Sequence, residues 1–126
     1  MSDDKRVLVV DDSMVNRKLA SAFLVKLGYV PEAVDCGQAA LDYLAANPPV
    51  NLILLDISMP GITGEEVCAS LRKDARFVNL PIIAYTAHAM THDVDRFLAN
   101  GFDAVLLKPN SLQDMEKAIA VAVAKH

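Results

Sequence analysis

The stretch Val7-Leu8-Val9-Val10-Asp11-Asp12-Ser13 passes directly from consecutive apolar side chains to two carboxylates and a hydroxyl. A short, uninterrupted apolar run is typical of a strand that is covered on both faces, as in a parallel sheet. This run spans residues 6–11, and similar runs recur at residues 50–56, 81–86 and 103–108, with a weaker one at residues 30–34. The sequence therefore predicts five strands.

Helical patterns lie between the predicted strands. The first has apolar residues at every fourth position and a glycine as its C-terminal stop: Val15, Leu19, Phe23, Leu27 and Gly28. Three more begin where a capping side chain precedes a polar partner by three residues: Asp35 with Gln38, Thr63 with Glu66, and Ser111 with Asp114. Another helical pattern, near residues 91–100, ends at Gly101. The helix that begins after Ser111 carries an apolar stripe of Leu112, Met115, Ile119 and Val123. Alternating strands and helices predict a right-handed α/β fold, the flavodoxin-like (βα)5 sandwich of strand order 2-1-3-4-5.

Composition limits the class of protein. The 126 residues are 53% hydrophobic and 22% charged, which fits one globular domain over residues 1–126 and excludes a disordered chain. The net charge of −4 offers no broad surface for nucleic acid or an anionic membrane. No apolar run could span a bilayer and no signal peptide is readable. Cys36 and Cys68 fit neither a disulfide framework nor a zinc site. We expect a soluble, cytoplasmic protein.

Polar residues follow four of the predicted strands: Asp11 and Asp12, Asp56, Thr86, and Lys108. In such folds the carboxyl ends of the strands form the site. Three carboxylates about 5 Å apart repel by roughly 3 kcal/mol per pair at an effective dielectric constant of about 20. Mg²⁺, which prefers oxygen ligands, or the Lys108 ammonium would offset that repulsion. We therefore predict an acidic metal site at this edge.

Each of these features also has a simpler explanation. The pair Asp11-Asp12 could cap the next helix, Asp56 could be a turn residue, and Lys108 could be a solvated loop residue. The joint occurrence at four strand ends favours a functional site. The three histidines show no metal-ligand spacing, and we expect His88, His92 and His126 at the surface. Cys68 shares a helical stripe with apolar neighbours and is expected to pack in the core.

Taken together, these segments resemble the receiver domain of two-component response regulators over essentially the whole chain. Four motifs in order and spacing carry the resemblance: Val7-Leu8-Val9-Val10-Asp11-Asp12-Ser13, Leu54-Leu55-Asp56-Ile57-Ser58-Met59-Pro60-Gly61, Ala84-Tyr85-Thr86-Ala87, and Leu107-Lys108-Pro109. The resemblance implies a phosphoacceptor aspartate, Asp56. It also implies Mg²⁺, with Mn²⁺ as a substitute, held by Asp11, Asp12, Asp56 and the backbone carbonyl of Ser58.

The same resemblance implies that Thr86, the backbone of Ala87 and Lys108 bind the phosphoryl group. It implies a histidine kinase or histidine phosphotransfer protein as the donor, a downstream protein target, and no direct nucleic acid or membrane partner. Ser58 and His88 lie two residues after Asp56 and Thr86, where we expect them to tune loss of the phosphoryl group. Beyond Mg²⁺-dependent gain and loss of that group, no enzyme activity is expected.

Two features depart from the pattern. Position 105, usually aromatic and mobile in such domains, is Val105, so an aromatic switch cannot operate there. The sequence ends at His126 with no output domain, which fits a stand-alone receiver or a receiver excised from a hybrid kinase.

Two other function classes compete with a signalling module. An aspartate-nucleophile phosphatase is expected to carry the motif Asp-x-Asp after its first strand, whereas Asp11 and Asp12 are adjacent here. A flavodoxin-like electron carrier needs a hydroxyl-rich and glycine-rich phosphate loop at that place, and two carboxylates would repel the flavin phosphate. The residues therefore favour the receiver.

Overall fold

The computed structural model describes residues 5–47 and 49–126. Strands and helices alternate along the chain, as predicted. The strands are β1 (Arg6–Val10), β2 (Val30–Val34), β3 (Leu52–Asp56), β4 (Ile82–Thr86) and β5 (Ala104–Leu107). The helices are α1 (Met14–Lys26), α2 (Gly37–Ala46), α3 (Gly64–Arg72), α4 (Thr91–Ala99) and α5 (Leu112–Ala124).

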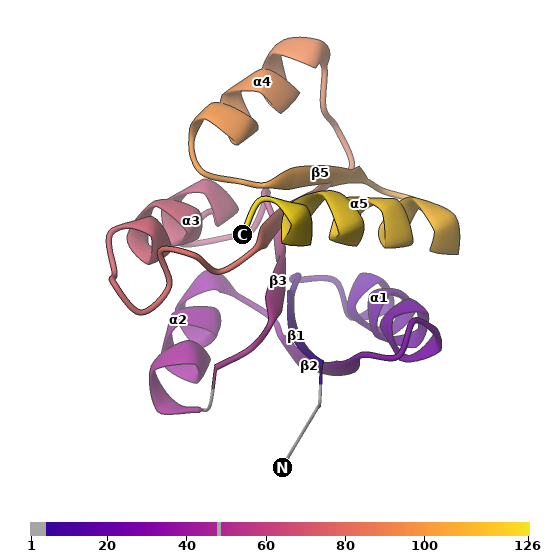
Figure 1. The fold of residues 1–126 in the computed structure, drawn as a ribbon, viewed down its shortest axis with the longest axis horizontal. Coiled ribbons are helices and arrows are strands. Elements are labelled where there is room, and N and C mark those ends of the chain that lie inside the picture. The colour runs from indigo at the N-terminus through magenta and orange to yellow at the C-terminus, as the bar shows by residue number, and fades with distance from the viewer. Residues whose placement is uncertain (1–4, 48) are drawn as a thin grey trace.

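The strands form one parallel sheet in the order β2-β1-β3-β4-β5, which confirms the predicted flavodoxin-like fold. Figure 1 shows α1 and α5 on one side of the sheet and α2 and α3 on the other. Buried Phe97 of α4 packs with the α2 and α3 side, so that helix belongs to the same layer. All five strands point their carboxyl ends toward one edge, where the connecting loops meet.

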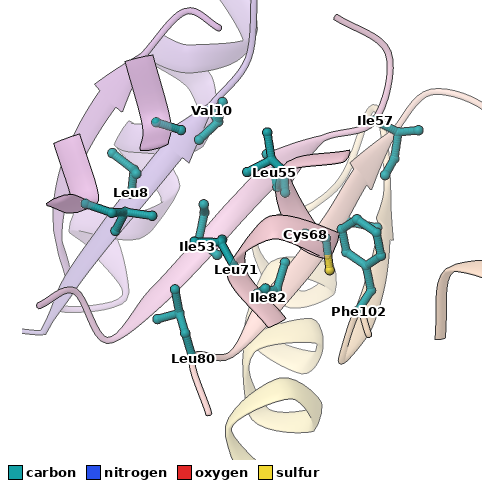
Figure 2. Close-up of a cluster of buried hydrophobic side chains, with 14 of the residues drawn as sticks. Leu8, Val10, Ile53, Leu55, Ile57, Cys68, Leu71, Leu80, Ile82 and Phe102 are labelled. Atoms are coloured by element: carbon teal, nitrogen blue, oxygen red, sulfur yellow. The ribbon is translucent and has the colours of Figure 1, made fainter. Parts of the chain in front are cut away.

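Two apolar clusters, one on each face of the sheet, hold these layers together. The cluster under α2 and α3 includes Leu8, Ile53, Leu55, Leu71 and Ile82, which converge in Figure 2. Cys68 is buried in this cluster and, like Cys36, is free, so its predicted packing role is confirmed. The α1 and α5 face has its own cluster. Burial on both faces explains why the central strands are apolar throughout.

The apolar stripe predicted for α1 is wrong over its first half. Val15 is 74% exposed and Leu19 is also exposed, while Ala20 and Leu24 are the buried residues. Residues four apart advance by about 40° around a helix with 3.6 residues per turn. The predicted stripe therefore turns from solvent at Val15 toward the sheet at Phe23, which packs against the core.

Two of the three predicted helix caps are confirmed. Thr63 with Glu66 and Ser111 with Asp114 each exchange reciprocal hydrogen bonds at the starts of α3 and α5. The predicted Asp35 cap is wrong, because the side chain of Cys36 accepts the hydrogen bond from the Ala39 amide.

The first residue of α2, Gly37, lies close to α3. A Cβ atom on Gly37 would lie 2.8 Å from Val67, so the helix begins at a glycine that packs closely against α3.

None of the helices in the described ranges combines the length and apolar character that a membrane crossing needs.

Candidate functional site

The acidic cluster predicted at the carboxyl edge of the sheet is present. Asp11 directly follows β1 and is fully buried, Asp56 ends β3 and is 4% exposed, and Asp12 is exposed. One carboxylate oxygen from each of the three residues lies within 4.8 Å of the others. Two buried carboxylates beside a third concentrate negative charge at this edge.

Lys108 partly neutralises this cluster. Its Nζ lies 2.6 Å from Asp11 Oδ2 and 3.3 Å from Asp56 Oδ1, and its side chain is largely buried. One ammonium thus serves two buried carboxylates and is closer to Asp11. The arrangement leaves an excess of negative charge, centred on Asp56 and the exposed Asp12.

The backbone around the acids fixes their orientation. The Ser13 amide donates to Asp11 Oδ1 at 2.9 Å, and the Ser58 amide donates to Asp56 Oδ1 at 3.2 Å. A Cβ atom on Gly64, at the start of α3, would lie 2.1 Å from the backbone oxygen of Asp56. Only glycine permits that approach, so the loop after β3 folds tightly around the aspartate.

Burial raises the pKa of Asp56 to about 6, and repulsion from Asp11 adds to the effect, whereas Lys108 and the Ser58 amide oppose it. The surroundings therefore destabilise the ionised form of Asp56, and a further positive charge beside it would stabilise that form. A set of carboxylate oxygens at the water-accessible edge of a sheet is the donor chemistry that Mg²⁺ prefers. The residues present thus fit a bound magnesium ion.

Thr86 ends β4 at the same edge but faces its own loop. Its hydroxyl donates to the His88 carbonyl at 3.0 Å and accepts from the His88 amide at 3.2 Å. Ser58, in the loop after β3, and Ala87 and His88, in the loop after β4, are exposed. The structure brings Asp11, Asp12, Asp56 and Lys108 together, and Thr86 completes the edge without binding the acids.

Two further contacts at the site were not predicted. Arg17 of α1 donates from Nη1 to the backbone oxygen of Asp11 at 2.8 Å. The Lys108 ammonium lies over the Tyr85 ring, 4.7 Å from its centroid. Residue alternation along β4 places Tyr85 and Thr86 on opposite faces of the sheet, but it does not reveal where the end of a lysine side chain lies.

Similarity to known proteins identifies the class of this protein. The sequence profile of the response regulator receiver domain matches residues 7–120, and the chain therefore belongs to that family. Receiver domains act with histidine kinases or phosphotransfer proteins and bind Mg²⁺.

Individual relatives agree with this assignment. The chain is 33% identical over 120 residues to the sensor histidine kinase RcsC of Salmonella typhi, covering 95% of this chain and 12% of the kinase. It is 32% identical over 111 residues to the two-component response regulator ORR5 of Oryza sativa subsp. japonica, covering 88% of this chain and 83% of that protein.

Solved structures share the fold of this chain. The chemotaxis protein CheY4 of Vibrio cholerae matches with a TM-score of 0.87 at 27% identity, covering 94% of this chain and 98% of that one. The chain thus spans most of some relatives and only a small part of the kinase.

Proposed function

We propose that the chain is a phosphoacceptor receiver that takes a phosphoryl group from a phosphohistidine donor onto Asp56 and signals through altered protein–protein binding. The observation that carries the proposal is the convergence of Asp56 with Asp11, Asp12 and Lys108 at one edge of the sheet. The raised pKa of Asp56 supports it, because a buried carboxylate that is poorly compensated gains from new cationic partners.

In the proposed transfer, an Asp56 carboxylate oxygen attacks phosphorus, the bond from phosphorus to the donor imidazole breaks, and the imidazole leaves with that electron pair. The carboxylates of Asp11, Asp12 and Asp56 and the Ser58 carbonyl would hold Mg²⁺ or Mn²⁺. The bound ion would neutralise charge on the incoming phosphoryl oxygens. Lys108 supplies the positive charge that the protein itself contributes.

The phosphoryl group would then recruit its ligands from neighbouring strands. The Thr86 hydroxyl would exchange its His88 partner for a phosphoryl oxygen, and the Ala87 amide and Lys108 would bind the others. The bonds from Thr86 and Lys108 are charge-assisted, and at roughly 1.5–3 kcal/mol each these two supply about 3–6 kcal/mol. That sum approaches the roughly 5.5 kcal/mol needed to reverse a 1:99 equilibrium.

The domain could work alone or within a larger kinase. The 33% identity to a segment covering 12% of a sensor histidine kinase favours a hybrid-kinase receiver as the second candidate. Both candidates use the same chemistry at Asp56, so one experiment tests them together.

Intact-mass measurement after incubation with acetyl phosphate and Mg²⁺ tests the proposal. The parent protein should gain one phosphoryl group that hydroxylamine removes, and Asp56→Asn should gain none. Asp103→Asn, which changes another buried carboxylate, is the matched control and should be phosphorylated. A mass shift that persists in Asp56→Asn would overturn the assignment.

A further inference from the structure

Tyr85 lies directly beside the phosphoacceptor site on the face of the sheet that α1 and α5 cover. It pairs in register with Asp56 of β3 and with Leu106 of β5. Its side chain belongs to the apolar cluster of that face, and the residue is 1% exposed. The ring is therefore fixed between the acidic edge and the core under α5.

The ring is a third neighbour of the Lys108 ammonium, beside the two carboxylates. Nζ is bounded by Asp11 at 2.6 Å, by Asp56 at 3.3 Å and by the Tyr85 ring, whose centroid is 4.7 Å away. An ammonium over an aromatic face is attracted by the ring quadrupole, more strongly where water is excluded. Tyr85 thus holds the lysine without adding another charge to the site.

The hydroxyl of Tyr85 extends this contact toward α5. It donates to Asn110 Oδ1 at 3.2 Å, and Asn110 Nδ2 donates to the backbone oxygen of Ser111 at 2.9 Å. Ser111 caps α5. Burial, together with the charges of Asp11 and Asp56, raises the pKa of Tyr85 to about 12, so the hydroxyl keeps its proton at neutral pH.

We propose that Tyr85 is a positioning residue whose ring holds Lys108 at the phosphoryl site and whose hydroxyl links that lysine to the start of α5. The proposal rests on the role of Lys108 in the proposed function. Val105, which is not aromatic, packs with the cluster on the opposite face. Tyr85 therefore places an aromatic link between the site and a helix on the α1 and α5 face.

A spectroscopic signature tests the ring contact without any phosphoryl transfer. The Cε protons of Lys108 should be shifted upfield by the ring current in the parent protein and in Tyr85→Phe, and the shift should vanish in Tyr85→Met. This signature reports the contact between the ring and the lysine, and the phosphorylation rates test what that contact does. Unshifted Cε protons in the parent would overturn the proposal even if Tyr85→Met failed to fold.

Rates of phosphorylation by acetyl phosphate test the positioning role. Tyr85→Met should slow the reaction by about 2- to 30-fold, the range that cation–π contacts span. Tyr85→Phe should restore most of the rate. Ile83→Met, on the same strand and face, is the control and should react like the parent. A parent that takes no phosphoryl group overturns the proposed function, whereas a phosphorylated parent matched by Tyr85→Met overturns the role of Tyr85.

The link to α5 has its own readout. Beryllofluoride, a phosphoryl mimic, should shift the backbone amide signals of residues 111–114 in the parent. Tyr85→Phe and Asn110→Ala each remove one partner of the hydrogen bond, and both should reduce these shifts. Shifts of parental size in both variants would overturn the proposed link.

Discussion

Two buried aspartates at opposite ends of the sheet differ in how their charge is compensated. Asp103, 7% exposed, lies just before β5, and Asp56, 4% exposed, ends β3. Asp103 Oδ2 accepts from Arg72 Nη2 at 2.9 Å, from the Ile82 amide at 2.9 Å and from His126 Nε2 at 3.0 Å. Asp56 shares one ammonium with Asp11 and receives one backbone hydrogen bond.

This difference separates a carboxylate with structural partners from the one that we propose as the phosphoacceptor. Asp103 has a guanidinium of its own, and Arg72 also donates to the backbone oxygens of Phe77, Leu80 and Gly101. That cluster connects α3 to the chain on either side of β4. Asp56 has fewer partners among the described residues, namely the Ser58 amide and the shared Lys108 ammonium. The two carboxylates are thus similarly buried but differently compensated, and the proposed difference in their roles rests on their partners.

Arg72→Met should have the largest effect on stability. Removing one partner of a buried ion pair leaves an uncompensated charge, which costs about 3–5 kcal/mol. We expect the free energy of unfolding, measured in urea, to fall by that amount, while folded protein is still phosphorylated at Asp56. The exposed pair of Arg76 and Asp74 provides the control, because Arg76→Met should change stability little. A small loss in Arg72→Met would contradict the structural role of this cluster.

Asp56→Asn should stabilise the protein at neutral pH. A carboxyl group with its pKa raised from 3.8 to about 6 binds more protons in the folded state, so its contribution is lost as pH rises through that window. At about 1.4 kcal/mol per pH unit, the gain on removing the charge is at most about 3 kcal/mol at pH 7.

The gain should nearly disappear at pH 4, where the parent carboxyl group is largely protonated in the folded state. Urea unfolding at both pH values, with a chelator present, measures the difference. Equal stability of parent and Asp56→Asn at pH 7 would mean that Asp56 is as well compensated as Asp103.

Mg²⁺ should reduce the contrast between the two aspartates. An ion that binds only the folded protein adds about 1.4 kcal/mol of stability at a tenfold excess over its dissociation constant. The melting temperature should rise with Mg²⁺ in the parent and in Asp35→Ala, an exposed aspartate at another place. Asp12→Ala should abolish the response. A parent whose melting temperature ignores Mg²⁺ would contradict the metal assignment.

The sequence was sufficient for the acidic edge because parallel strands bring their carboxyl ends together whatever their side chains do. It was insufficient for the Asp103 cluster, since Arg72 lies 31 residues away and no periodicity connects the two. The α1 stripe failed for a related reason: burial depends on which side of the helix meets the sheet, and Val15 lies beyond that contact. The contact of Tyr85 with Lys108 could not be predicted from the sequence, because it depends on the conformation of the long Lys108 side chain.

The smallest expected effect concerns the rim around Asp56. The Ser58 amide is bonded to the Asp56 carboxylate, and the His88 backbone is bonded to the Thr86 hydroxyl, so the backbone of each residue is held at the edge of the site. We expect the side chains of Ser58 and His88 to flank the approach of the water that hydrolyses the phosphoryl group.

His88→Glu and Ser58→Asn should each change the dephosphorylation rate several-fold, and a threefold change corresponds to about 0.7 kcal/mol in activation free energy. Decay of the phosphorylated protein, followed by intact mass, measures the rate, with the exposed His92→Glu as a control. Identical decay in both rim variants and the parent would mean that water reaches Asp56 without passing either side chain, and the lifetime of the signal would then depend on the buried groups alone.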